Sequence, residues 1–145
     1  MQTFLPDENF VESARQLDDK RLGKQRLEAL QILRTLFGEQ DTWKNHPAVL
    51  MWKGYEGSLF VYALAMILEW RGRGFKDNQI GVWEDLKNKY IMKVSTFKKP
   101  PWVGNMDFHK SHRSNLLRKF PEHYRKFWPN ECDDLPYYWP VRKGE

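Results

Sequence analysis

The sequence predicts an all-α fold, a compact single-domain helical bundle with an irregular aromatic C-terminal tail. Three observations support this prediction. Apolar residues recur at helical spacing from Leu22 to Phe37, residues 58–71 are apolar nearly all round, and no segment shows the strict alternation typical of a half-buried strand. A chain of 145 residues is the usual size of one domain, so we expect residues 1–145 to form a single domain.

Capping residues mark the first two helices. Asp7 or Asn9 is suited to cap a short helix that ends near Gln16, because a side-chain oxygen there accepts from the first free amides. Asp18 is suited in the same way to a longer helix that runs to about Phe37, where a glycine follows.

The remaining helices follow from apolar runs and their breakers. His46-Pro47 opens a third helical region, and residues 58–71 predict a central helix buried on every side. Asp77 is suited to cap a helix that runs to about Met92. The last two helices are predicted over residues 110–119 and, after a proline, over residues 122–127.

Composition indicates a polyanionic partner. The net charge is +5, and a basic surplus favours nucleic acid because each cation that replaces a counterion on a phosphate contributes to affinity. Aromatic residues make up 15% of the chain, with seven Trp, more than a core of this size needs, so we expect some rings on a binding surface.

Other features concern compartment and assembly. Cys132 is the single cysteine, so no intrachain disulfide forms. The N-terminus lacks the pattern of a signal peptide, and the longest apolar run, residues 59–68, is about half the length that spans a bilayer. We expect a monomeric cytoplasmic protein that associates with the nucleoid when bound to DNA.

The segment from Leu17 to Leu30 carries the most informative polar residues. Arg21, Lys24, Gln25 and Glu28 are three, four or seven residues apart and therefore share one flank of a helix. One carboxylate among cations has the chemistry to stabilise an oxocarbenium-like centre or to move a proton. The alternative is a solvated face of ion pairs. Arg26 lies inside the apolar stripe, where it needs a buried acceptor or a ligand phosphate.

A second polar segment runs from His109 to Lys119. Ser, Asn and Arg side chains commonly contact phosphates, and a helix N-terminus adds oriented amides. We therefore interpret the segment, with the neighbouring Lys98 and Lys99, as a footprint on the DNA backbone; the alternative is an ordinary exposed helix. The predicted DNA-binding residues here are His109, His112, Arg113, Asn115, Arg118 and Lys119.

A zinc site and a stacking surface are two further possibilities. His109, His112, His123 and Cys132 match none of the usual closed Cys/His spacings, so we expect no metal ligand and no cofactor. The aromatic residues from Tyr124 onward, interleaved with cations, are suited to stack on bases. For any single ring the alternative is a lid over the core. Tyr124 is included among the candidate DNA contacts.

Four segments taken together resemble the pyrimidine-dimer DNA glycosylase family, the endonuclease V-like type found in phages and bacteria. They are Leu17-Asp18 with Leu22, Glu28 and Leu30; His46-Pro47-Ala48-Val49 with Trp52; Arg73-Gly74-Phe75; and the run from His109 to Leu117. The resemblance covers most of the chain in order, is strongest over residues 1–37 and 105–125, and is weak over residues 77–104.

The resemblance implies an all-helical enzyme that flips a nucleotide and cuts its glycosidic bond. In the family the chain's own α-amine attacks the sugar C1′ to form an imine, and a helix glutamate serves the sugar; Glu28 matches that glutamate. The amine would belong to Met1, or to Gln2 if Met1 is removed. The residue before the glutamate is usually Arg but here is Leu27, so Arg21 or Arg26 would take its phosphate-holding role. His46 of the second motif joins the candidate DNA contacts.

The leading hypothesis is therefore a DNA glycosylase that excises a pyrimidine dimer or modified pyrimidine from double-stranded DNA, with lyase activity through the imine as a further step. If no imine forms, Glu28 would activate water. A non-enzymatic DNA- or RNA-binding module is the alternative, and it predicts that Glu28 is dispensable. A metal-dependent nuclease needs clustered carboxylates, which the sequence lacks.

Overall fold

The computed structural model describes residues 1–94 and 96–141, and over these residues it contains helices and no strand. The all-α prediction is confirmed. In chain order the helices are α1 (Phe10–Gln16), α2 (Asp19–Leu36), α3 (Pro47–Leu50), α4 (Glu56–Gly72), α5 (Ile80–Tyr90), the 3-10 turn η1 (Ile91–Lys93), α6 (Met106–Lys119) and α7 (Pro121–Tyr124).

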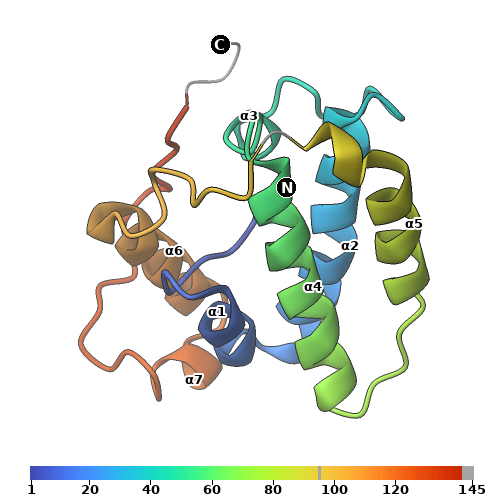
Figure 1. Ribbon diagram of the computed structural model, residues 1–145. Coiled ribbons are helices and arrows are strands. Elements are labelled where there is room, and N and C mark those ends of the chain that lie inside the picture. Colours follow the sequence, from blue (N-terminus) through green and yellow to red (C-terminus); the bar gives the residue numbers. More distant parts are fainter. Residues whose placement is uncertain (95, 142–145) are drawn as a thin grey trace.

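The helices form two neighbouring groups joined by the N-terminal segment (Figure 1). α2 packs along α4, and α5 and α1 also contact α4. α6 and α7 lie together on the other side of α1. Gly23 of α2 faces the Trp70 ring of α4 so closely that a Cβ atom would lie 3.0 Å from the ring, which explains a small residue at this helix crossing.

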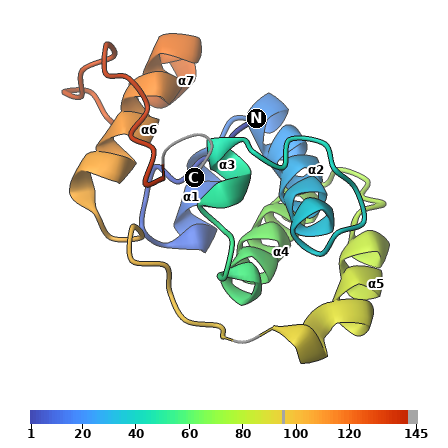
Figure 2. The same cartoon turned by 90° about the horizontal axis from the view of Figure 1, so that it is seen from above.

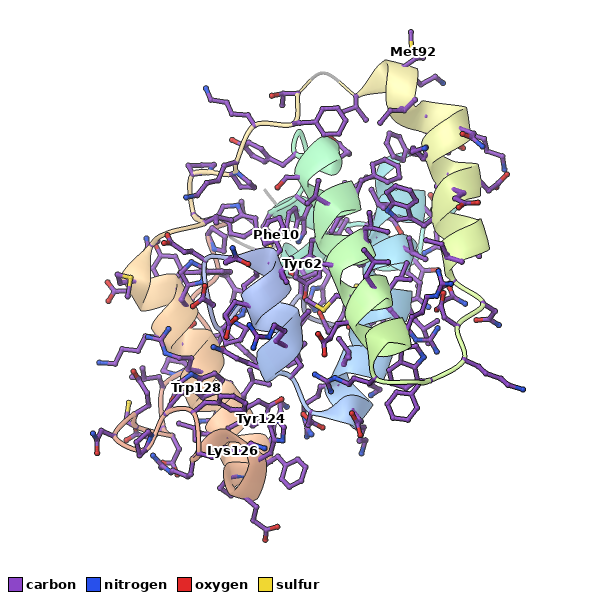
Figure 3. All side chains as sticks on the ribbon, turned by 60° about the horizontal axis from the view of Figure 1, so that its bottom comes forward. Phe10, Tyr62, Met92, Tyr124, Lys126 and Trp128 are labelled. Atoms are coloured by element: carbon purple, nitrogen blue, oxygen red, sulfur yellow. The ribbon has the colours of Figure 1, made fainter. Side chains whose placement is uncertain are left out.

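The core consists of large side chains drawn from nearly every element. Trp52, Tyr62, Phe60, Phe108 and Tyr124 are its largest fully buried members. Figure 3 shows Tyr62 of α4 beside Phe10 of α1, with ring centroids 5.6 Å apart. Tyr124 lies at the far end of the molecule, stacked on Trp128 at 5.2 Å.

The first helix is confirmed: it runs from Phe10 to Gln16, and of the two expected caps Asn9 is the one used. Two other predicted helices were wrong at their first residue. The helix expected from Asp77 begins at Ile80, although the Asp77 carboxylate still accepts from the Ile80 amide at 2.9 Å. The helix expected from residue 110 begins at Met106, because the Asn105 side chain caps it.

Three further expectations need correction. Asp18 precedes α2 but makes no side-chain cap, since other partners occupy its carboxylate. The central helix begins at Glu56, and it is not buried on every side, because Val61 and Leu68 are half exposed. The helix expected over 122–127 ends at Tyr124. The described residues after Tyr124 contain no further helix, as predicted for the tail.

Arg73 at the end of α4 joins three elements. Its Nη2 donates to the carbonyl oxygens of Ala14, Arg15 and Leu17 at the C-terminal end of α1. Its remaining nitrogens bind Asp19 of α2 and Glu69 of α4. The guanidinium thus fixes the bend between α1 and α2, from which the polar flank of α2 begins.

No helix in the described part of the chain is both long enough and apolar enough to cross a membrane.

Candidate active site

The N-terminal segment is extended and buried. Gln2, Thr3, Phe4 and Leu5 are each 7% exposed or less, although no regular element contains them. Backbone groups that enter the interior need partners. Here most of those partners are side chains from α2, α4 and α6.

Gln25 of α2 holds the first part of this segment. Its Oε1 accepts from the Phe4 amide at 3.0 Å, and its Nε2 donates to the Gln2 carbonyl at 2.9 Å. The hydroxyl of Tyr62 lies 2.6 Å from the same Oε1. Gln25 is 1% exposed, so its amide replaces a strand partner for the N-terminal segment.

Two histidines of α6 hold the next residue. The Leu5 amide donates to Nδ1 of His112 at 2.9 Å, and the Leu5 carbonyl lies 2.8 Å from Nδ1 of His109. Nε2 of His109 accepts from the Gly104 amide at 2.8 Å, so its proton is on Nδ1. Both rings therefore bind Leu5 in their neutral form. We call His109, His112 and Leu5 the histidine clamp.

Burial accounts for the titration behaviour of the histidine clamp. Desolvation lowers the pKa of His112 to about 3, with a smaller contribution from His109. Desolvation also lowers the pKa of His109, partly offset by its bond to the Leu5 carbonyl. Both shifts favour the neutral rings that the clamp requires.

A cavity of about 310 Å³ lies between the start of the chain and α2. It brings together most of the residues expected on the flank of α2 and at the N-terminus. Its lining consists of Met1, Gln2, Phe4, Lys20, Arg21, Lys24, Gln25, Glu28, Lys119 and Tyr137. One carboxylate thus lies among four cationic side chains, a composition suited to a sugar between phosphates.

Glu28 lies next to the first peptide groups of the chain. The Gln2 amide nitrogen is 3.3 Å from its Oε2, and Nε2 of Gln25 is 3.5 Å from the same oxygen. The carboxylate also acts on Tyr62: burial raises the pKa of that phenol well above its usual value, and the Glu28 charge raises it further. Tyr62 therefore stays a neutral donor beside the site.

Arg21 is held at the cavity by the buried carboxylate of Asp18, which Tyr124 in turn binds. Its Nη1 lies 3.1 Å from Oδ2 of Asp18, which is 4% exposed. The other Asp18 oxygen accepts a short hydrogen bond from the Tyr124 hydroxyl. Burial and this bond raise the pKa of Tyr124. Tyr124, considered from the sequence as a DNA contact, is fully buried and instead orients Arg21 through Asp18.

Arg26 is placed away from the cavity. Its Nη1 pairs with Asp77 at 2.7 Å, and its guanidinium lies over the Trp70 ring at 4.6 Å. The buried acceptor that its position in the apolar stripe demands is thus Asp77. Between the two arginines considered for holding a phosphate, the cavity contains Arg21.

The remaining candidates of α6 contact the protein's own backbone. Arg113 donates to the Pro6 carbonyl at 2.8 Å, and Arg118 donates to the Asp133 carbonyl at 2.7 Å. Asn115 donates to the carbonyls of Ser111 and Leu135. With Ser111 and Ser114, which accept from the Tyr138 and Leu135 amides, these side chains hold the C-terminal tail. Lys119 alone of the α6 candidates lines the cavity.

His46 does not line the cavity. Its Nδ1 accepts from the Ala48 amide at 3.0 Å and so caps α3. Its ring packs edge-on between Trp43 at 5.6 Å and Trp139 at 5.7 Å. Within the described residues, no group of three or more His, Cys, Asp or Glu side chains is arranged to hold a metal ion.

Sequence reasoning missed Lys20 and Phe4 as cavity residues and named Tyr137 only among the tail rings suited to stack on bases. Lys20 lies four residues before Lys24 on α2, so helical spacing places it on the same flank and predicts it as a member of the site. Phe4 and Tyr137 carry no local signature, because they reach the cavity only when both chain ends dock on α6. Burial raises the pKa of Tyr137 to about 12, so this wall of the cavity is uncharged.

A family model described as pyrimidine dimer DNA glycosylase matches residues 1–80. The chain belongs to the pyrimidine dimer DNA glycosylase family. The matched part contains Met1, Gln2, Glu28 and the cations of α2, while Lys119 and Tyr137 lie outside it. No curated protein matches the chain, and no solved structure does. As a member of this family the protein is an enzyme of the DNA glycosylase class, and DNA is its substrate.

Proposed function

We propose that the cavity between the N-terminal segment and α2 excises a pyrimidine dimer or modified pyrimidine, with Glu28 as the catalytic carboxylate. The observation that carries this proposal is the 3.3 Å separation between the Gln2 nitrogen and the Glu28 carboxylate inside a cavity rich in cations. The cavity beside α1 and α4, by contrast, is lined by one carboxylate and one cation, Glu8 and Lys99, and by no chain terminus.

The cations supply the binding of DNA in this proposal. Lys20, Arg21, Lys24 and Lys119 face the cavity and would contact the phosphates that flank the extruded nucleotide. Arg21 is held by its ion pair with Asp18, and in this proposal it takes the place of the Arg that the family usually has before the glutamate. The aromatic rings of Phe4 and Tyr137 offer apolar walls to the base or sugar.

We further propose that the terminal α-amine is the nucleophile. An α-amine is intrinsically less basic than the side-chain amine of a Lys, which favours it as a nucleophile near neutral pH. Its lone pair forms a bond to C1′, and the glycosidic bond breaks with its electron pair going to the base, which takes a proton. Loss of the amine proton and opening of the sugar ring leave an imine.

Glu28 has two roles in this sequence. Its negative charge stabilises the positive charge that develops on the sugar as the base departs. It then accepts a C2′ proton, and the electrons of that C–H bond expel the 3′ phosphate and break the strand. Water hydrolyses the remaining imine and releases the amine.

Both ends of the described chain contribute to the cavity. Residues 1–28 form one wall, and Lys119 and Tyr137 form the other. This supports treating residues 1–145 as one catalytic domain that acts as a monomer.

The experiment uses duplexes that carry a panel of dimers and modified pyrimidines, with released base and strand breaks scored separately. Borohydride should trap a covalent protein–DNA adduct, and peptide mapping should place it on Met1, or on Gln2 if mass spectrometry shows Met1 removed. An uncleaved N-terminal tag should suppress trapping, whereas the same tag at the C-terminus should not.

The outcomes separate the alternatives. An adduct on Lys20 or Lys24 would assign the nucleophile to a cavity lysine. Base release with no adduct would favour water activated by Glu28. No glycosidic cleavage in any substrate would refute the proposed excision; for a dimer it is scored as a new abasic site, because the cut base stays joined to its neighbour.

A further inference from the structure

Trp43 has an unusual backbone conformation in the loop between α2 and α3. Its φ angle is 64°, and among the described residues it is the only non-glycine with a positive φ. Its side chain is 51% exposed. A bulky side chain is disfavoured in this left-handed region, and such strained residues cluster at functional sites.

The loop around Trp43 is fixed to α2. The Thr35 hydroxyl donates to the Thr42 carbonyl at 3.1 Å, and the Gln40 amide donates to the Gln31 carbonyl at 3.1 Å. The His46 amide donates to the Trp43 carbonyl at 2.9 Å. The surrounding hydrogen bonds therefore hold the indole in an exposed position, where a glycine would satisfy the backbone without strain.

A row of rings connects Trp43 with the cavity. Trp43 packs edge-on against His46 at 5.6 Å, and His46 packs edge-on against Trp139 at 5.7 Å. Trp139 lies 5.6 Å from Tyr137, which lines the cavity. Seen from above, the start of the chain, α3 and the last described part of the tail gather on one face (Figure 2). DNA bound at the cavity would run along this face.

We propose that the Trp43 indole stacks on a base pair beside the excision site and supports the duplex while a nucleotide is extruded. This proposal rests on the proposed function. Extrusion of a nucleotide opens a gap in the base stack, and proteins that distort DNA fill such gaps with apolar or aromatic side chains. The cavity cations hold the phosphates, and Trp43 is the exposed end of the ring row that leads away from them.

The test compares Trp43→Gly with a matched control, Phe97→Ala. Phe97 is similarly exposed, at 59%, but it lines a groove beside α1 and α4 instead of the cavity. Trp43→Gly removes the ring and relaxes the backbone, so its melting temperature should equal or exceed that of the wild type. Trp43→Phe should retain part of the activity.

The first readout is base release from a lesion in paired and single-stranded DNA. Trp43→Gly should lower kcat/KM on the paired duplex by roughly 5- to 100-fold, the range for loss of one base–aromatic stack. On single-stranded DNA, where no stack must be opened, it should match the wild type within a factor of about two. Phe97→Ala should match the wild type on both.

The second readout does not depend on catalysis. A duplex with a stable abasic analogue beside 2-aminopurine should lose fluorescence when the wild type binds, because the indole stacks on the reporter. Trp43→Gly should bind the same duplex without that loss.

Equal activity of Trp43→Gly and wild type on paired DNA would overturn the proposal, as would equal losses on paired and single-stranded DNA. If the wild type releases no base from any lesion, the proposed excision fails, and the fluorescence assay still decides whether Trp43 stacks.

Discussion

The polar flank of α2 and the polar segment of α6 have similar amino-acid character, yet they face different surroundings. On α2, Arg21, Lys24 and Glu28 line a cavity open to solvent. On α6, His109, His112 and Asn115 are buried and bind the backbone of the N-terminal segment and the tail. The polar flank of α2 lines the cavity with charged side chains, and the polar segment of α6 holds the chain ends that complete the cavity.

The difference lies in side-chain length and in the neighbours that each helix has. Long charged side chains keep their heads in water, and those of α2 do so at the cavity. Short Ser, Asn and His side chains suit burial only when backbone groups satisfy them, and two extended segments lie against α6 to do so. In this structure the α6 motif that resembles a known family binds the protein's own backbone.

The largest effect is expected for Glu28→Gln. This change should lower base release by roughly 10²- to 10⁴-fold, the usual contribution of a catalytic acid–base group. DNA affinity and melting temperature should stay close to the wild type, because the amide preserves the shape. Glu12→Gln, which removes a surface ion pair with Arg15, is the control and should change neither. Normal turnover by Glu28→Gln would remove this carboxylate from the mechanism.

His112→Phe should act through stability instead. It leaves the buried Leu5 amide without an acceptor, which costs about 1–3 kcal/mol. Urea unfolding should show this loss, and activity should recover in part on cooling. Lys110→Ala, on the exposed side of the same helix, should leave stability unchanged. A His112→Phe protein as stable as the wild type would mean that the histidine clamp contributes nothing to the fold.

The histidine clamp also predicts a pH dependence of stability. Below about pH 6.5 the unfolded chain binds a proton on His112, whereas the folded chain does not until about pH 3. Stability should therefore fall as the pH falls through this window, by about 1.4 kcal/mol per pH unit for this residue. The lowered pKa of His109 adds to the same trend. The measurement is the free energy of unfolding of wild type and His112→Phe at several pH values. If both proteins lose stability equally as the pH falls, the dependence does not come from His112.

The smallest effect separates the two sets of cations. Lys24→Ala and Lys119→Ala should each flatten the log–log dependence of DNA affinity on salt by about 0.9, the value for one phosphate contact. Arg113→Ala, considered from the sequence alone, is expected to flatten it likewise. Because Arg113 binds the Pro6 carbonyl, we expect it instead to lower stability and leave the slope unchanged. A flatter slope for Arg113→Ala would restore α6 as a DNA-binding helix.

The sequence predicts the parts of this site that depend on one helix. Periodicity alone places Arg21, Lys24, Gln25 and Glu28 on one flank, and the cavity lining includes all of them. It also shows that Arg26 needs a partner, but it does not show that Asp77, distant in the chain, is that partner.

Contacts between distant segments were beyond prediction. The bonds from Leu5 to His109 and His112 join residues 104 and 107 positions apart, and no local pattern marks them. The same holds for Tyr137, whose place in the cavity depends on the docking of the tail along Ser111, Ser114 and Asn115. The partner of a buried polar side chain depends on the tertiary fold. A polar run that binds the protein's own backbone therefore looks, in sequence, like one that binds a ligand.

Because both chain ends dock on α6, the cavity forms only after the late part of the chain has been synthesised. During translation Glu28 emerges long before Tyr137, and at about 5–20 residues per second the interval between them is roughly 5 to 20 s. Until α6 (Met106–Lys119) has been synthesised, residues 2–5 lack the histidine clamp that holds them in the folded protein. A chain that ends before Tyr137 therefore lacks one wall of the cavity, and the cavity is complete only late in synthesis.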